Sequence, residues 1–203
     1  MGTTLELLEK KAEERYYKEH ERNTQINNSL SIPIGIIVAL LGVVGFFLVS
    51  FPFKIINTPI VWVILCLFIV GLVTLIYYIS RAIYFLSKVF LGLKYAYIPN
   101  PKRICIYAKQ LAKYYKSQQV QNIDEVVEKE VREYLAIAYS RTAYNNSRLN
   151  ELKGFYLTKA KKYIILTIVV FMVSSIPFVV LHYCDKNLSS DVQNVEIVGD
   201  ADG

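Results

Sequence analysis

Three long segments of the chain contain no acidic or basic residue, and they constrain the fold more than any other feature. They are residues 31–53, 55–80 and 163–184. A helix needs about 20 apolar residues to cross a hydrocarbon core of about 30 Å, and each segment is long enough. A soluble chain of 203 residues could not cover three such helices with the rest of its sequence. The segments therefore predict transmembrane helices, and they exclude a soluble enzyme, a secreted disulfide scaffold and a disordered chain.

The basic residues between these segments predict how the chain is oriented. Residues 81–162 hold sixteen Lys and Arg against six acidic residues, whereas residues 185–203 hold one Lys against five acidic residues. Because cytoplasmic loops carry the excess of Lys and Arg, we expect residues 1–30 and 81–162 in the cytoplasm and the C-terminus outside. The net charge of +6 then reports topology, and nucleic acid becomes a less favoured partner.

These observations predict an all-α membrane protein with three transmembrane helices and a helical cytoplasmic region, in which one long helix continues into the third span. The expected parts are a cytoplasmic amphipathic helix in 1–30, a transmembrane hairpin in 31–80 with spans 31–53 and 58–80, a cytoplasmic helical region in 81–162, a third span in 163–184, and an acidic mobile tail in 185–203.

Four local signals place the helix ends. Thr3 and Glu6 have the spacing of a capping box for a helix over residues 3–28. The helix of the second span should run on to Tyr97, before the break at Ile98-Pro99-Asn100-Pro101. The long helix should begin near Asn122 and meets no proline until Pro177. That proline leaves open a third helix that re-enters the membrane instead of crossing it.

Residues 102–118 form an amphipathic stretch rich in Lys and Tyr. Such a stretch can lie on the inner leaflet, bind a nucleotide or nucleic acid, or simply pack against the protein. The sequence favours the leaflet and leaves the other two interpretations open.

Apolar residues of the long helix recur at alternating spacings of four and three, which is typical of a coiled-coil or bundle seam. The expected seam positions are Val127, Val131, Tyr134, Ala138, Leu152 and Phe155. Midway along this predicted seam, polar residues stand at Arg141, Asn145 and Arg148. They could specify register or oligomeric state, as a buried Asn does in coiled coils, or leave the seam open to water.

The same polar residues also fit a ligand site. Arg141 and Arg148 lie two helical turns apart and could hold phosphate oxygens. Asn145 or its neighbour Asn146 could hydrogen-bond a base. A tyrosine could stack on that base, the candidates being Tyr134, Tyr139 and Tyr144. Either interpretation stays open at this point.

Small residues share one face of the first span. Gly35, Ala39 and Gly42 follow the small-xxx-small pattern that lets another helix approach closely. That helix is either the second span of the same chain or a span of a neighbouring subunit. No charged residue lies in any span, so we expect no intramembrane proton relay.

The sequence gives no sign of catalysis. Its only histidines, His20 and His182, belong to none of the common metalloprotease, nucleotide-binding or hydrolase motifs. Its three cysteines have no zinc-site spacing. We therefore expect no enzyme activity, no catalytic residue, no cofactor and no bound metal.

The predicted parts include a cytoplasmic helix, a close pair of spans and then a cytoplasmic helix that carries the run 139–153 (YSRTAYNNSRLNELK). Together these parts resemble the SLATT-type membrane effectors of bacterial antiphage and nucleotide-signalling systems. The resemblance covers residues 1–160 and rests on architecture; this chain adds a third span and an acidic tail. It implies an oligomeric, pore-forming protein of the bacterial inner membrane that permeabilises the membrane when its cytoplasmic region senses a signal.

Two other functions fit the same features. One is a non-catalytic membrane anchor or sensor subunit that recruits a soluble protein through its cytoplasmic helices, and the other is a toxin-immunity membrane protein. The expected partners are the lipid bilayer, further copies of the chain, and a cytoplasmic protein or a nucleotide signal.

Overall fold

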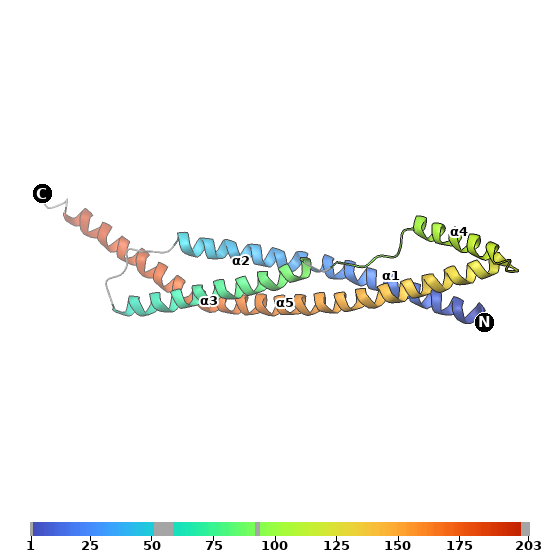
Figure 1. Cartoon of the computed structure of the whole chain (residues 1–203). Coiled ribbons are helices and arrows are strands. Elements are labelled where there is room, and N and C mark those ends of the chain that lie inside the picture. The colour runs from blue at the N-terminus through green and yellow to red at the C-terminus, as the bar shows by residue number, and fades with distance from the viewer. Residues whose placement is uncertain (1, 51–58, 92–93, 200–203) are drawn as a thin grey trace. The chain divides into compact units, whose positions relative to one another are not determined.

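A computed structural model describes the backbone of residues 2–50, 59–91 and 94–199, and the side chains of these ranges from residue 4 to residue 183. Every regular element in these ranges is an α-helix, which confirms the all-α prediction. The helices are α1 (Gly2–Asn28), α2 (Ser31–Val49), α3 (Pro59–Phe90), α4 (Pro101–Ser117) and α5 (Ile123–Gly199) (Figure 1).

Three helical stretches are long and apolar enough to cross a membrane. They contain α2, α3 and the part of α5 that includes the third apolar segment, so the structure is compatible with a multi-pass membrane protein. The long helix does continue into that segment, and Pro177 lies inside α5 without ending it. The backbone of α5 is helical as far as Gly199, within the predicted tail. The orientation in the membrane stays a prediction.

The helix ends agree with the sequence in most places. The helix α1 begins at Gly2, and the side chain of the expected cap Thr3 lies outside the described residues. The break before α4 is confirmed, because the Asn100 side chain caps that helix by accepting a hydrogen bond from the Lys102 N–H at 2.9 Å. The prediction that α3 reaches Tyr97 is wrong, since α3 ends at Phe90 and residues 94–100 are not helical.

The chain divides into two compact units. The first contains residues 1–29 and 89–155, and the second contains residues 30–88 and 156–203. Helix α5 supplies residues to both units.

In the second unit, α2, α3 and α5 form a three-helix bundle. Their buried positions recur at spacings of three, four or seven residues, as bundle packing requires. On α2 they are Pro33, Ile37, Leu40, Val44 and Phe47; on α3, Phe68, Leu75, Ile79, Ala82 and Leu86; on α5, Leu157, Ala160, Ile164, Thr167, Ser174, Phe178 and Leu181.

An aromatic cluster joins the three helices of this bundle. The Phe47 ring lies 4.7 Å from Phe178 and 5.6 Å from Phe68, measured between ring centroids. Nearby, α3 approaches α5 so closely that a Cβ added at Gly71 would clash with the Ser174 side chain. Many other apolar side chains of the bundle are exposed, as expected for helices that face lipid.

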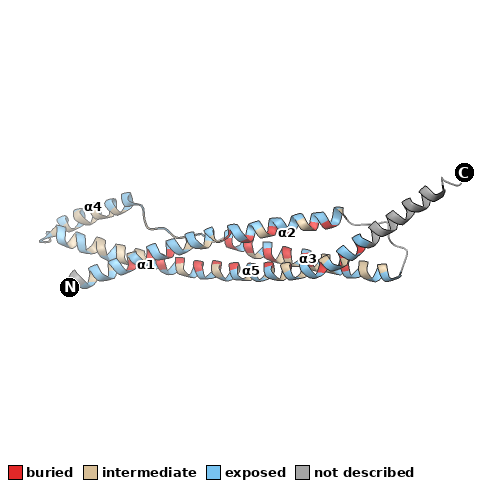
Figure 2. Cartoon of the chain, turned by 180° about the vertical axis from the view of Figure 1, so that it is seen from behind, coloured by how far each residue is buried: buried red, intermediate tan, exposed pale blue. Residues whose placement is uncertain are grey.

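In the first unit, α1 packs against the first part of α5. Salt bridges from Arg132 to Glu9, at 3.4 Å, and to Glu6, at 3.6 Å, join the two helices at their exposed edge. Helix α4 has no buried residue (Figure 2). It contacts α5 through the rings of Tyr107 and Tyr134, whose centroids lie 5.0 Å apart.

Candidate functional site

The buried stripe of α5 in the first unit consists mainly of polar residues. Ala143, Asn146, Asn150 and Lys153 are all buried, at spacings of three, four and three residues. This stripe faces α1, as the hydrogen bonds below show. The expected seam positions Leu152 and Phe155 are exposed, so the prediction is wrong there for packing within the chain. Val127, Val131 and Ala138 are partly buried, and a seam between copies of the chain stays a prediction. The helix carries apolar residues on more than one face, and α4 contacts one of them at Tyr134.

Asn146 is buried and Tyr139 is half-buried against the Tyr16 ring, whereas the other five predicted ligand residues lie on the exposed side of α5. They are Tyr134, Arg141, Tyr144, Asn145 and Arg148. Tyr134 pairs with the Tyr107 ring, and Arg141 lines a cavity described below. Because all five are accessible, they do not break an apolar seam, as the sequence had suggested. Their role in binding a ligand or a partner stays a prediction.

The Asn146 side chain holds the non-helical segment 94–100 against α5 through hydrogen bonds. Its Oδ1 accepts a hydrogen bond from the Ala96 N–H, and its Nδ2 donates one to the Ala96 carbonyl, both at 2.9 Å. One fully buried amide thus satisfies both backbone groups of Ala96. This pairing explains why the chain after α3 is not helical here, because helix formation would need the same two backbone groups.

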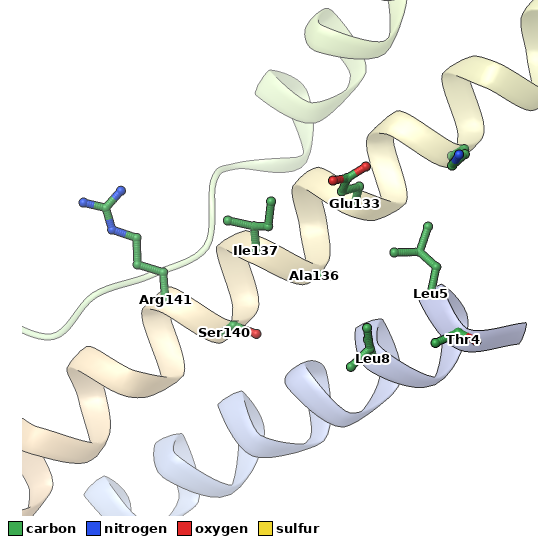
Figure 3. Close-up of a pocket in the computed structure, with 9 residues that line it drawn as sticks. Thr4, Leu5, Leu8, Glu133, Ala136, Ile137, Ser140 and Arg141 are labelled. Carbon is green, nitrogen blue, oxygen red and sulfur yellow. The ribbon is translucent and has the colours of Figure 1, made fainter. Parts of the chain in front are cut away.

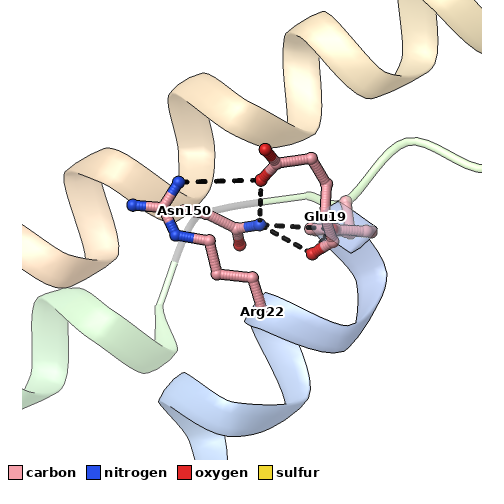
Figure 4. Close-up of polar contacts among 4 residues, drawn as sticks. Glu19, Arg22 and Asn150 are labelled. Atoms are coloured by element: carbon pink, nitrogen blue, oxygen red, sulfur yellow. Dashed lines mark hydrogen bonds and ion pairs between the residues drawn. The ribbon is translucent and has the colours of Figure 1, made fainter. Parts of the chain in front are cut away.

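Asn150, one turn further along α5, contacts α1 and the same segment (Figure 4). Its Nδ2 donates to the Glu19 carbonyl at 2.8 Å, to Glu19 Oε2 at 2.9 Å and to Tyr95 Oη at 3.4 Å. The Tyr95 hydroxyl in turn donates to the Glu19 carbonyl at 2.6 Å. Asn150 Oδ1 is buried and has no hydrogen-bond partner among the described residues.

Lys153 completes the polar stripe. Its Nζ donates a hydrogen bond to Asn23 Oδ1 on α1 at 2.7 Å. Burial lowers the pKa of this ammonium from its ordinary value, because desolvation penalises the charged form. Burial also raises the pKa of the Tyr95 hydroxyl, a hydrogen bond from Asn150 opposes the shift, and the Glu19 charge adds to it.

We call Glu19, Tyr95, Asn146, Asn150 and Lys153 the polar layer. Polar contacts of this kind contribute less to stability than an equally well packed apolar core, but they fix one arrangement of the helices. The unpaired Asn150 oxygen shows that this arrangement is not fully satisfied. The polar layer is therefore the part of the first unit in which a buried polar atom is left without a partner among the described residues.

A cavity of about 770 Å³ lies between the start of α1 and α5 in the same unit (Figure 3). Its walls are mainly apolar, and Arg141 stands at its edge with its side chain pointing away from α1. The lining residues are Thr4, Leu5, Leu8, Lys129, Glu133, Ala136, Ile137, Ser140 and Arg141. The described residues contain no group of His, Cys, Asp and Glu that could hold a metal ion.

The small-residue face of α2 is open in the single chain. A Cβ added at Gly35 or Gly42 would meet no atom within 4 Å, and Ala39 is exposed. The close helix contact within the chain is instead at Gly71, which the sequence analysis did not select. Packing of the α2 face against a neighbouring subunit stays a prediction.

Sequence reasoning also missed Glu19, Tyr95, Asn150 and Lys153. A signal for the two α5 residues did exist. The buried stripe of the third span, extended backwards in steps of three and four from Leu157, passes through Lys153, Asn150 and Asn146. No comparable pattern points to Tyr95, which lies in a segment without regular structure.

No family model, curated protein or solved structure matches this chain.

Proposed function

We propose that the chain is an oligomeric effector of the bacterial inner membrane that permeabilises the membrane when its cytoplasmic helices receive a signal, as in antiphage defence. The observation that carries the proposal is that α5 supplies three of the five residues of the polar layer and also contains the third apolar segment. A change in the contacts of α1 with α5 thus acts on a helix that also belongs to the membrane bundle.

The composition of the spans supports an assembly-dependent pore over a transporter. No acidic or basic residue lies in the three apolar segments, so a single chain offers no charged pathway for an ion or proton. The open face of Gly35, Ala39 and Gly42 offers a close contact between copies. The resemblance to SLATT-type effectors and the excess of basic residues in 81–162 support a cytoplasmic first unit.

The proposal is tested by measuring the membrane potential of bacteria that overproduce the chain. We expect depolarisation, measured with a potential-sensitive dye. Replacing both Arg141 and Arg148 by Ala should abolish the response without lowering the amount of protein in the membrane, because these exposed cations are the candidate signal-binding residues. A normal membrane potential in cells that contain the intact chain and its trigger would refute the proposal.

The cavity favours a second candidate function, a sensor or anchor subunit that recruits a soluble protein. Leu8 and Ile137 line the cavity and are 57% and 60% exposed, as expected for a surface that accepts an apolar helix of a partner. Under this alternative, a specific soluble protein copurifies with the chain and is lost on replacing Leu8 and Ile137 by Asp. The membrane potential then stays normal throughout.

A further inference from the structure

The second unit has an unusual charge distribution at one end of its bundle. Residues 30–88 and 156–184 contain no Asp or Glu. Their basic residues, apart from Lys54, are Arg81, Lys88, Lys159, Lys161 and Lys162. Two of these five cations follow the end of the second apolar segment, and three precede the beginning of the third. Residues 30–88 and 156–184 offer no carboxylate to pair with them.

These five cations lie at the same end of the bundle because α3 and α5 are antiparallel. The Phe85 ring on α3 stacks against Tyr163 on α5 at 5.4 Å, whereas Phe68, nearer the start of α3, lies 5.8 Å from Phe178. Residues 81–88 therefore lie beside the beginning of the third span, where Lys161 and Lys162 are exposed.

Arg81 is the first charged residue after the second apolar segment, and three aromatic rings surround its guanidinium. The guanidinium carbon lies 5.2 Å from the Phe85 centroid, 5.6 Å from Tyr163 and 5.7 Å from Tyr84. These rings come from both α3 and α5. Cation–π contacts of this kind hold the group in place but do not neutralise its charge.

The hydrogen bonds of this guanidinium are incomplete. Arg81 Nε is buried and has no hydrogen-bond partner among the described residues, while the side chain as a whole is only partly buried. A partly buried cation normally has an anionic partner. Because Nε itself is enclosed, a phosphate would be met by the two terminal nitrogens of the planar guanidinium, which can donate two parallel hydrogen bonds to its oxygens.

The position of Arg81 in the sequence indicates where that phosphate comes from. The end of an apolar segment of spanning length lies at the level of the lipid headgroups, where basic and aromatic residues are enriched. Lys88, whose ammonium lies 5.5 Å from the Tyr84 ring, adds a second cation one to two turns further along α3.

We propose that Arg81, held between Tyr84, Phe85 and Tyr163, binds the phosphate of an anionic phospholipid in the leaflet that borders residues 81–162. The proposal rests on the membrane-spanning helices and not on the effector function. The cation–π contacts orient the guanidinium, the lipid phosphate accepts its hydrogen bonds, and the exposed lysines nearby raise the local concentration of anionic headgroups.

The test uses the full chain in a detergent micelle and the rise of its thermal midpoint as lipid is added. The probes are a short-chain phosphatidylglycerol, the phosphatidylcholine of the same chain length, and inorganic phosphate. The intact chain should respond most strongly to phosphatidylglycerol. In Arg81→Gln the apparent affinity for it should fall about tenfold or more, because charge-assisted hydrogen bonds are lost.

Lys10→Gln is the matched control, because it removes the same charge from an exposed residue of α1, outside the second unit and outside the basic stretch 102–118. It should respond like the intact chain. Arg81→Lys keeps the charge but not the planar donor pair, so its affinity for phosphatidylglycerol should lie between those of the intact chain and Arg81→Gln. If Arg81→Gln does not fold, Arg81→Lys takes its place in the comparison with the intact chain.

Three outcomes would overturn the proposal. Equal responses of the intact chain and the Arg81 variants to phosphatidylglycerol would make Arg81 a purely structural contact between α3 and α5. An equal response to phosphatidylcholine would show that the lipid effect does not depend on anionic charge. A response to inorganic phosphate as strong as that to phosphatidylglycerol, and lost in Arg81→Gln, would assign the site to a free anion and not to a lipid.

Discussion

Asn145 and Asn146 are neighbours in the sequence with opposite environments, and they give a direct test of the polar layer. Asn145 is exposed, whereas Asn146 is fully buried and pairs with both backbone groups of Ala96. Asn146→Ala should destabilise the first unit by about 1–3 kcal/mol, because it leaves those groups without partners. The thermal midpoint of the detergent-solubilised chain should fall by about 2–4 °C for each kcal/mol.

Asn145→Ala is the control for this prediction, and it should change stability by no more than about 0.5 kcal/mol. Equal effects of the two substitutions would contradict the register of the buried stripe.

Lys153 should make the stability of the chain depend on pH. Its pKa is lowered from the ordinary 10.5 by burial, so at pH values just below 10.5 the unfolded chain binds more protons than the folded chain. Stability therefore rises as the pH increases towards 10.5. The raised pKa values of Tyr16, Tyr95 and Tyr139 act in the opposite direction, but only above about pH 10.

We expect the thermal midpoint of the intact chain to rise as the pH increases towards 10.5. In Lys153→Met this rise should be smaller, whereas Lys113→Met, at an exposed position, should keep it. An unchanged rise in Lys153→Met would show that another group is responsible.

At this scale the structure was least predictable from the sequence. Polar side chains were expected at the seam of the long helix, but at Arg141 and Arg148 in place of Asn150 and Lys153. Both sets have helical spacing, and the choice between them depends on which face α1 covers. That contact joins residues more than a hundred positions apart, and spacing within one helix does not reveal it.

At the scale of the elements, two glycines inside apolar helices, Gly71 on α3 and Gly42 on α2, have different surroundings. A Cβ at Gly71 would clash with Ser174 on the facing helix, whereas one at Gly42 would meet no atom of the chain. Gly71→Val should force α3 and α5 apart and destabilise the second unit by about 1–3 kcal/mol. Gly42→Val should leave the thermal midpoint unchanged.

Gly42→Val also tests the proposed contact between copies of the chain. If α2 packs against a neighbouring subunit, Gly42→Val should reduce the fraction of oligomer obtained by crosslinking in membranes. Crosslinking equal to that of the intact chain would place the contact elsewhere.

The helices themselves were largely predictable from the sequence. Long apolar segments, the Pro99-Asn100-Pro101 break and the helical spacing after Asn122 each have a local cause, so they do not depend on distant contacts. The end of α3 was misplaced because its cause is tertiary. Residues 94–100 leave the helical path where the Asn146 side chain binds Ala96, about fifty positions away.

At the scale of the whole molecule, the charge distribution predicts the topology. Residues 81–162 carry a net charge of +10 and residues 185–203 a net charge of −4. A reporter that is active only in the cytoplasm should work when fused to the N-terminus, and one that is active only outside should work at the C-terminus. A cytoplasmic C-terminus would mean that the third apolar segment re-enters the membrane.

The buried positions of α5 in the second unit form two series with a seven-residue repeat. One is Ala160, Thr167, Ser174 and Leu181, and the other is Leu157, Ile164 and Phe178, with the partly buried Phe171 between the last two. An ideal straight helix has 3.6 residues per turn, so a seven-residue stripe drifts by about 20° per repeat. The stripe stays in contact along this length only when the helices wind around one another with a left-handed twist, and they then cross at about +20°. A substitution that changes this winding should therefore alter the tilt of all three helices together.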